Sequence, residues 1–189
     1  MALSKIDPVT SIDLDDKEYF QVELTTSMTA LADVSIHTVD FGGKGTVKYD
    51  TKSNFDSVND AYLLGSSDGV YLINFSMGIR SESISAEAII DAIAAVFVAT
   101  DGTTFVAVNG AGLRTYDQQG DETGSVMLSG SFIYKSTTST TKIILKGFAN
   151  TNPNTYQISD DAQANQGSAS SADPFATARC TFLSVVRIA

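Results

Sequence analysis

The segment from Gly69 to Ile79 constrains the fold of this chain more than any other. Its odd-numbered positions are all apolar and form one face: Tyr71, Ile73, Phe75, Met77 and Ile79. Its even-numbered positions are mixed and include Leu72 and Asn74. Alternation with period two is typical of a β-strand that buries one face, because successive side chains point to opposite sides. The sequence therefore predicts a long strand with one buried face, in a fold built on sheets.

Other short β-rich runs alternate with turn signals at the spacing of a sandwich or barrel. The further expected strands are Tyr19–Thr25, His37–Phe41, Thr46–Tyr49, Val96–Ala99, Phe105–Val108, Val126–Tyr134, Lys142–Phe148 and Cys180–Ile188. Expected turns are Gly42–Gly45, the hairpin signal Asp101-Gly102, Asn109-Gly110 and Gly110–Gly112. Val126–Tyr134 and Lys142–Phe148 are expected to pair with each other across the loop 136–141.

Two segments do not follow the strand pattern. Between Ser85 and Ala95, Ala and Ile recur at spacings that suit a short helix capped by Ser85, and a strand beginning near Ile93 is an equal alternative. The stretch 150–178 is polar and low in complexity, so it is expected to be one long loop. With 189 residues the chain has the size of one domain. We expect an arm over 1–17 and a single all-β domain over 18–189.

Charge and hydropathy exclude several classes of partner. The formal net charge is −10, which repels phosphate backbones and argues against binding nucleic acid. The longest apolar stretch, Ala92–Ala99, is too short to span a bilayer, and the first residues lack the apolar core of a secretion signal. The single cysteine, Cys180, is expected to be a buried structural thiol. The sequence predicts a protein made in a reducing cytoplasm, with no membrane partner.

The residues needed for common catalytic sites are missing from the sequence. The one histidine, His37, lies in an alternating run, where a surface or satisfied core position is the ordinary role. No Gly-x-Ser-x-Gly elbow occurs, and the glycines at 42–45 lack the spacing of a phosphate loop. We expect no enzyme activity, no cofactor and no metal site. Calcium at Asp13, Asp15 and Asp16, or at Asp160 and Asp161, stays open, with a solvated acidic turn as the simpler interpretation.

Four pieces of the sequence, in order, resemble the tumour necrosis factor and complement globular-head superfamily. Gly69–Ser76 resembles its Gly-x-Tyr strand motif, and Val39–Phe41, Val47–Thr51 and Asn54–Asp56 are similar to the run before that motif. Val126–Phe132 is similar to its penultimate sheet strand. Thr181–Val186 is similar to its closing Thr-Phe-x-Gly strand, with Ser184 where glycine is usual. The resemblance covers about 37–189.

This resemblance implies a jelly-roll β-sandwich of about ten strands that packs as a compact homotrimer. Carried over by position, the residues facing the trimer are Leu72, Asn74, Met127, Ile133, Phe182, Val186 and Ile188. The closing strand supports this assignment because Phe182–Val186 is apolar on both faces, as in a strand that is buried on both sides. A loop that covers the outer face of this strand is the alternative.

Two function classes remain from the sequence. The first is a structural virion protein: a trimeric decoration or cement protein that sits on the surface of a phage head. It would bind the major capsid protein through arm residues Ile6, Asp7, Pro8, Val9, Ile12 and Leu14. The second is a trimeric module that binds a receptor or a carbohydrate, such as a fibre tip or a cell-surface ligand. We expect the first, because a compact trimer with a short arm is all that it requires.

Overall fold

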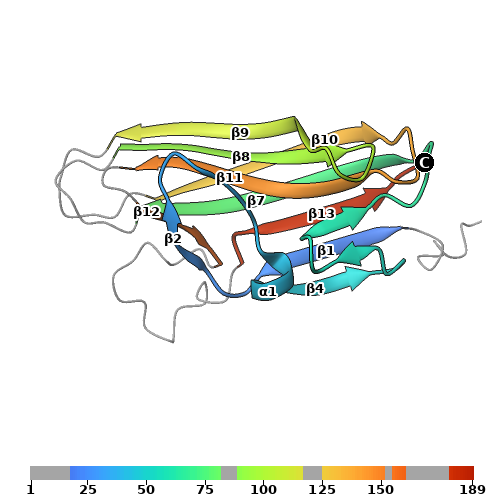
Figure 1. Ribbon diagram of the computed structural model, residues 1–189, viewed down its shortest axis with the longest axis horizontal. Coiled ribbons are helices and arrows are strands. Elements are labelled where there is room, and N and C mark those ends of the chain that lie inside the picture. The colour runs from blue at the N-terminus through green and yellow to red at the C-terminus, as the bar shows by residue number, and fades with distance from the viewer. Residues whose placement is uncertain (1–17, 82–88, 117–124, 152–154, 161–178) are drawn as a thin grey trace, which may run out of the picture.

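The computed structural model describes residues 18–81, 89–116, 125–151, 155–160 and 179–189. Two antiparallel sheets pack face to face as a sandwich (Figure 1). One short helix, α1 (Phe41–Lys44), lies among these residues. This architecture confirms the prediction of an all-β jelly roll.

The first sheet, sheet A, has seven strands, and its longest strand is β7 (Val70–Ser81). The other strands are β1 (Tyr19–Leu24), β2 (Met28–Ala32), β4 (Gly45–Asp50), β10 (Ser125–Lys135), β12 (Thr155–Ser159) and β13 (Phe182–Arg187). On one side, β7 pairs with β10 along its whole length. On the other side it pairs first with β13 and then with β12. Beyond these strands the sheet continues from β13 to β1 and β4, and from β12 to β2.

The second sheet, sheet B, has six strands, with β11 (Lys142–Thr151) near its centre. The others are β3 (Ile36–Thr38), β5 (Phe55–Asp56), β6 (Ala61–Leu63), β8 (Ile89–Ala99) and β9 (Val106–Tyr116). One edge of β11 pairs with β8, which continues to β9. The other edge pairs with β6 and, further along, with β3.

The predicted buried face of β7 forms the centre of the core between the sheets. Its apolar side chains are all buried: Tyr71, Ile73, Phe75, Met77 and Ile79. Two glycines on other strands make room for these large side chains. A Cβ atom at Gly130 would lie 2.6 Å from the Phe75 ring, and one at Gly147 would lie 2.7 Å from the sulfur of Met77. A side chain at Gly130 would therefore displace the Phe75 ring, and one at Gly147 would displace the thioether of Met77.

A buried carboxylate joins the two sheets at the N-terminal end of β1. Glu18 is buried, and its side chain accepts hydrogen bonds from the Tyr62 hydroxyl (3.2 Å), the Tyr71 hydroxyl (2.9 Å) and the Gly65 backbone N–H (3.0 Å). Burial, and then the negative charge of Glu18, raise the pKa of Tyr62 well above its ordinary range. Because Tyr62 belongs to β6 and Tyr71 to β7, Glu18 connects sheet B with sheet A.

Several sequence predictions are confirmed in outline. Strands occupy most of the expected runs, including β1, β4, β7 and β13. The hairpin predicted around Asp101-Gly102 joins β8 and β9. Gly102 has a φ of +76°, a conformation that glycine adopts at little cost. Cys180 is buried, as expected, and its thiol donates to the carbonyl of Ser159 at 3.1 Å.

Other predictions are wrong. Residues 89–95 belong to β8, so the helical alternative for Ser85–Ala95 fails over its described part, and the strand begins before Ile93. Asn109-Gly110 and Gly110–Gly112 are not turns, because β9 runs through them. The ladder between β8 and β9 shifts register at Val96/Phe97, where Val96 faces Asn109 and Phe97 faces Ala107. The turn-forming residues mark an irregularity in a continuing strand.

The expected pairing of Val126–Tyr134 with Lys142–Phe148 is also wrong. β10 pairs with β7 in sheet A, whereas β11 pairs with β8 in sheet B. The loop between them crosses from one sheet to the other: Ser136 N–H donates to the carbonyl of Gly69, and Leu64 N–H donates to that of Thr141. A Ser/Thr-rich connection of this length therefore builds a crossover here and not a hairpin.

Two further expectations need correction. The stretch 150–178 is not one loop, because it contains the end of β11 and the strand β12; residues 152–154 and 161–178 lie outside the described residues. The strand expected over His37–Phe41 is only β3, and Phe41 begins α1. The side chain of Asp40 accepts the Gly43 N–H at 2.7 Å, which caps this single turn of helix.

Candidate self-association surface

The candidate site is the outer face of sheet A, which points away from the core. Because Tyr71 and Ile73 point inward, the alternation of β7 turns Leu72 and Asn74 outward. The antiparallel register places neighbours beside them: Leu72 is opposite Ile133 and Val186, and Asn74 is opposite Ser131 and Ser184. The face is therefore made of rungs that cross β10, β7, β13 and β1.

The first rung is apolar over four strands. Its members are Ile133, Leu72, Val186 and Tyr19, in the order β10, β7, β13 and β1. Ile133 is 65% exposed. Just beyond β13, the side chain of Ile188 is 52% exposed, and its backbone N–H donates to the carbonyl of Val70 at 2.7 Å. Exposed Ile133 and Ile188 thus adjoin the half-buried Leu72 and Val186, and contiguous apolar side chains of this kind mark a surface that another protein surface can cover.

The second rung is polar, and its side chains form hydrogen bonds with one another. Its members are Ser131, Asn74, Ser184 and Gln21. The Ser131 hydroxyl donates to the Asn74 side-chain oxygen at 2.7 Å, and the Asn74 amide donates to the Ser184 hydroxyl at 3.3 Å. These two hydrogen bonds can persist when the row is covered, because both partners of each bond lie within the same face.

The centre of the third rung is apolar. Phe182 lies opposite Ser76 on one side and Glu23 on the other. The Ser76 hydroxyl lies 3.3 Å from the sulfur of Met127, whose side chain is 50% exposed on β10. The outer face of sheet A thus presents apolar groups on both sides of its hydrogen-bonded polar row.

A network of side chains closes the β1–β4 side of this face. The Tyr19 hydroxyl donates to the Gln21 side-chain oxygen at 2.8 Å, and the Gln21 amide donates to Glu23 at 2.9 Å. Glu23 forms an ion pair with Lys48 at 3.3 Å. The rings of Tyr19 and Tyr49 lie 5.2 Å apart. Burial, followed by the nearby Tyr49 and Glu23, raises the pKa of Tyr19.

The structure brings six of the seven predicted trimer-facing residues to the outer face of sheet A, and Ile188 lies just beyond the end of β13 in that sheet. Their role in self-association stays a prediction. Sequence reasoning missed Tyr19, Gln21 and Tyr49, although the alternation in Tyr19–Leu24 already separates outward Tyr19 and Gln21 from buried Phe20 and Val22. The position of Tyr49 depends on the register shift between β1 and β4 at Gln21/Val22, which no local pattern reveals.

The other candidate residues are dispersed. The predicted arm residues and Asp13, Asp15, Asp16 and Asp161 lie outside the described residues. Asp160 forms an ion pair with Arg179 at 2.7 Å and accepts a hydrogen bond from Ser27. His37 lies edge-on against the Tyr156 ring, at 5.7 Å between centroids. Over the described ranges, no group of three or more His, Cys, Asp or Glu side chains is placed to hold a metal ion.

The membrane prediction can be compared with the helices of the structure. Within the described parts of the chain, no helix is both long enough and apolar enough to cross a membrane.

Comparison with known proteins supports the fold alone. No protein-family model and no curated protein matches the chain. Among solved structures, murine APRIL at pH 8.5 is similar, with a TM-score of 0.52 and 10% identity over 91% of this chain and 99% of that chain. Eiger TNF from S. frugiperda is similar with a TM-score of 0.52 and 8% identity, over 92% of this chain and 93% of that one. The chain therefore has a jelly-roll fold like that of these TNF structures.

Proposed function

We propose that this chain is a structural protein that assembles as a homotrimer and decorates the surface of a phage head. The outer face of sheet A carries this proposal. It is the surface on which apolar rungs flank a polar row whose hydrogen bonds are made internally. A lone sandwich would leave this face in water, whereas association would remove its apolar side chains from water.

A trimer is the assembly that the fold favours. The resemblance to the tumour necrosis factor and complement globular-head superfamily implies inner sheets packed around a three-fold axis, and the structural neighbours have the same fold. In that arrangement the outer face of sheet A lies toward the axis. The apolar side chains of Phe182 and Val186 on β13, near the middle of sheet A, would then be covered by the other protomers.

The proposed partner on the head is the major capsid protein. Residues 1–17 join the domain at Glu18, which is held in place by Tyr62, Tyr71 and Gly65. A fixed point of departure in each protomer would give a trimer three equivalent arms. Three arms that engage three equivalent patches raise avidity by roughly 10²- to 10⁴-fold over a single contact. The protein would be made in the host cytoplasm and function on the capsid.

A second candidate is a trimeric module that binds a receptor or a carbohydrate. The likeness to Eiger TNF favours it, because that structure has the same jelly-roll fold. The two candidates share the trimer and differ in the partner. Binding to phage heads that lack the decoration protein supports the capsid role. Binding to intact host cells, without binding to heads, supports the receptor or carbohydrate role.

The mass of the native protein in solution tests the assembly. Light scattering at micromolar concentration should give three times the 20.0 kDa chain mass. A mass of one chain across the micromolar range would contradict both candidates at once.

The attachment is tested by deleting residues 2–16, which leaves Glu18 and the whole described domain in place. We expect a folded trimer that no longer adds to heads lacking the decoration protein. The full-length trimer is the control and should bind the same heads in a sedimentation assay. Equal binding by the truncated and full-length proteins would show that the arm is not the attachment element.

A further inference from the structure

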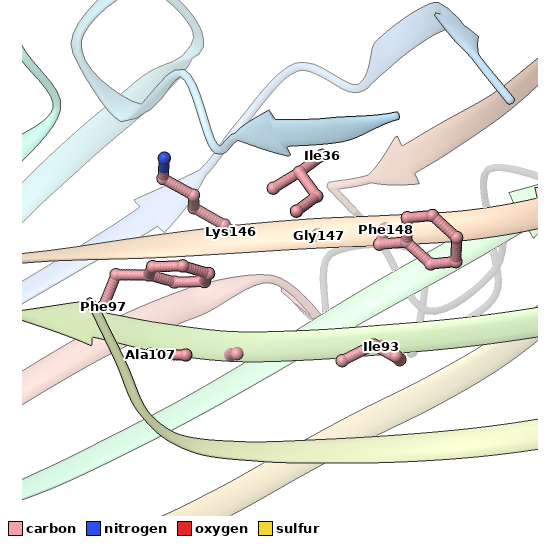
Figure 2. A pocket seen from close by; sticks show the side chains of 8 residues that line it. Ile36, Ile93, Phe97, Ala107, Lys146, Gly147 and Phe148 are labelled. Carbon is pink, nitrogen blue, oxygen red and sulfur yellow. The ribbon is translucent and has the colours of Figure 1, made fainter. Parts of the chain in front are cut away.

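The opposite side of the sandwich carries a second, different surface. A hollow of about 250 Å³ lies on the outer face of sheet B, away from the self-association surface. Its lining residues come from β3, β8, β9 and β11 and are Ile36, Ile93, Ala95, Phe97, Ala107, Lys146, Gly147 and Phe148. Figure 2 shows Lys146 and Phe97 toward one end of the hollow, and Ile93 and Phe148 toward the other.

The hollow exists because small residues lie between large ones. Ala95 on β8 is opposite Gly110 on β9, and Phe97 is opposite Ala107. Toward the other end, Phe148 is opposite Ile93 on one side and Ile36 on the other. Gly147, which also lines the hollow, has no side chain to fill it. The small residues form a floor, and the large apolar side chains form the walls.

The walls are open to solvent. Ile36 is 61% exposed and Ile93 is 49% exposed. Exposed apolar side chains that are contiguous around a hollow, unlike singly scattered ones, mark a surface for a partner or a ligand. Among the lining residues, only Lys146 carries a charge or a polar side chain.

Lys146 differs from its neighbours in how its charge is used. Its Nζ lies 5.0 Å from the centroid of the Phe97 ring, a cation–π contact that holds the amine beside the hollow. Lys142, four residues earlier on the same face of β11, forms an ion pair with Asp56 at 3.5 Å. No carboxylate among the described residues forms such a pair with Lys146. In a chain with a net charge of −10, this ammonium group is a local site for an anion.

The chemistry of the hollow selects one kind of ligand. An extended peptide laid along it would bury backbone N–H and C=O groups against side chains that offer no hydrogen-bond partner, which is costly. A molecule with an apolar body and a single anionic group at one end would lose no hydrogen bonds, because its body has none to make and its charge would lie beside Lys146. The volume is slightly below the roughly 300–1,000 Å³ of drug-sized pockets, which favours a short body.

We propose that this hollow binds a small apolar carboxylate, such as a medium-chain fatty acid. The carboxylate would pair with the ammonium group of Lys146, and the apolar body would lie over Ala95 toward Ile93 and Phe148. The opposite orientation is disfavoured because Ile93 and Phe148, at the other end of the hollow, offer no charge to pair with a carboxylate. This inference does not depend on the trimer or on the capsid.

Titration calorimetry with octanoate and with octanol tests the role of the charge. We expect octanoate to bind the full-length protein about tenfold more tightly than octanol, equivalent to about 1.4 kcal/mol, because its carboxylate can form a charge-assisted hydrogen bond with Lys146. Lys146→Met keeps the apolar stem and should abolish this preference. Lys142→Met is the matched control and should retain it. Equal affinities in the native protein, or a preference that survives Lys146→Met, would overturn the proposal.

Methyl NMR locates the ligand independently of affinity. Octanoate should shift the methyl resonances of Ile36, Ile93 and Ala95. Shifts confined to Leu72 and Ile133 would place the ligand on sheet A and overturn the assignment, as would the absence of any shift at millimolar octanoate. The mass measured by light scattering is a separate readout, so this proposal and the trimer can fail independently.

Discussion

Both outer faces of the sandwich carry exposed apolar side chains, but the two sheets arrange them differently. On sheet A, apolar rungs alternate with a polar rung whose side chains bond one another, such as Asn74 with Ser131 and Ser184. On sheet B, the apolar side chains surround a floor of alanine and glycine, and one lysine lies at the side without a carboxylate partner among the described residues. A face whose polar groups are already paired suits a broad protein surface. A hollow with one unpaired charge suits a small ligand.

The largest difference in association is expected when the same charge is introduced on each face in turn. Val186→Asp places a carboxylate in the proposed contact between protomers, where burial of an unpaired charge is costly. We expect association to weaken at least about hundredfold, equivalent to ~2.8 kcal/mol. Ile93→Asp adds the same charge to sheet B and should leave association unchanged. Sedimentation equilibrium measures both, and equal effects of the two variants would contradict the assignment of the faces.

A smaller effect is expected from the polar rung of sheet A. Asn74→Ala removes the acceptor of the Ser131 hydroxyl and the donor to Ser184. If the rung is covered by another protomer, both hydroxyls lose a partner where water cannot replace it, at a cost of about 1–3 kcal/mol. Association should therefore weaken about tenfold or more. Asn59→Ala removes an exposed amide that donates to Asp56 and serves as the control. No change in Asn74→Ala would mean that this rung stays in water.

The smallest effect concerns pH. The pKa of Tyr19 is raised above its ordinary value of 10.0, first by burial and then by Tyr49 and Glu23. Burial between protomers would raise this pKa further, so the neutral phenol is favoured in the trimer. Association should be fully retained below about pH 10 and weaken a few-fold as the pH rises through the protomer's pKa. Tyr19→Phe should remove this dependence. A pH profile unchanged by the substitution would exclude Tyr19 from the contact.

Strands were predictable where burial follows a simple period. The alternation in Gly69–Ile79 and Tyr19–Thr25 identifies both the strand and its inward face, because one side of each strand meets the core. The pattern fails in β8, where alanine and isoleucine at 89–95 fit a helix and a strand equally well. Which structure forms depends on pairing with β9 and β11, and these contacts are distant in sequence.

The two surfaces were predictable to different degrees. The resemblance located six residues of sheet A's outer face, because long strands in a fixed order determine which residues become neighbours. The hollow on sheet B was missed entirely. Its lining residues Ile36, Ile93 and Phe148 come from three strands whose register the sequence does not reveal.

The buried Glu18 also determines how a mechanical load would enter the domain. A pull on residues 1–17 reaches Glu18 first, where the Tyr62 and Tyr71 hydroxyls pass the force to sheet B and sheet A together. Behind Glu18, β1 lies between β13 and β4 with hydrogen bonds on both edges. Force along β1 therefore shears two ladders of bonds at once and does not open them one after another. A load applied at Glu18 along β1 would therefore be resisted without first detaching a strand from the sandwich.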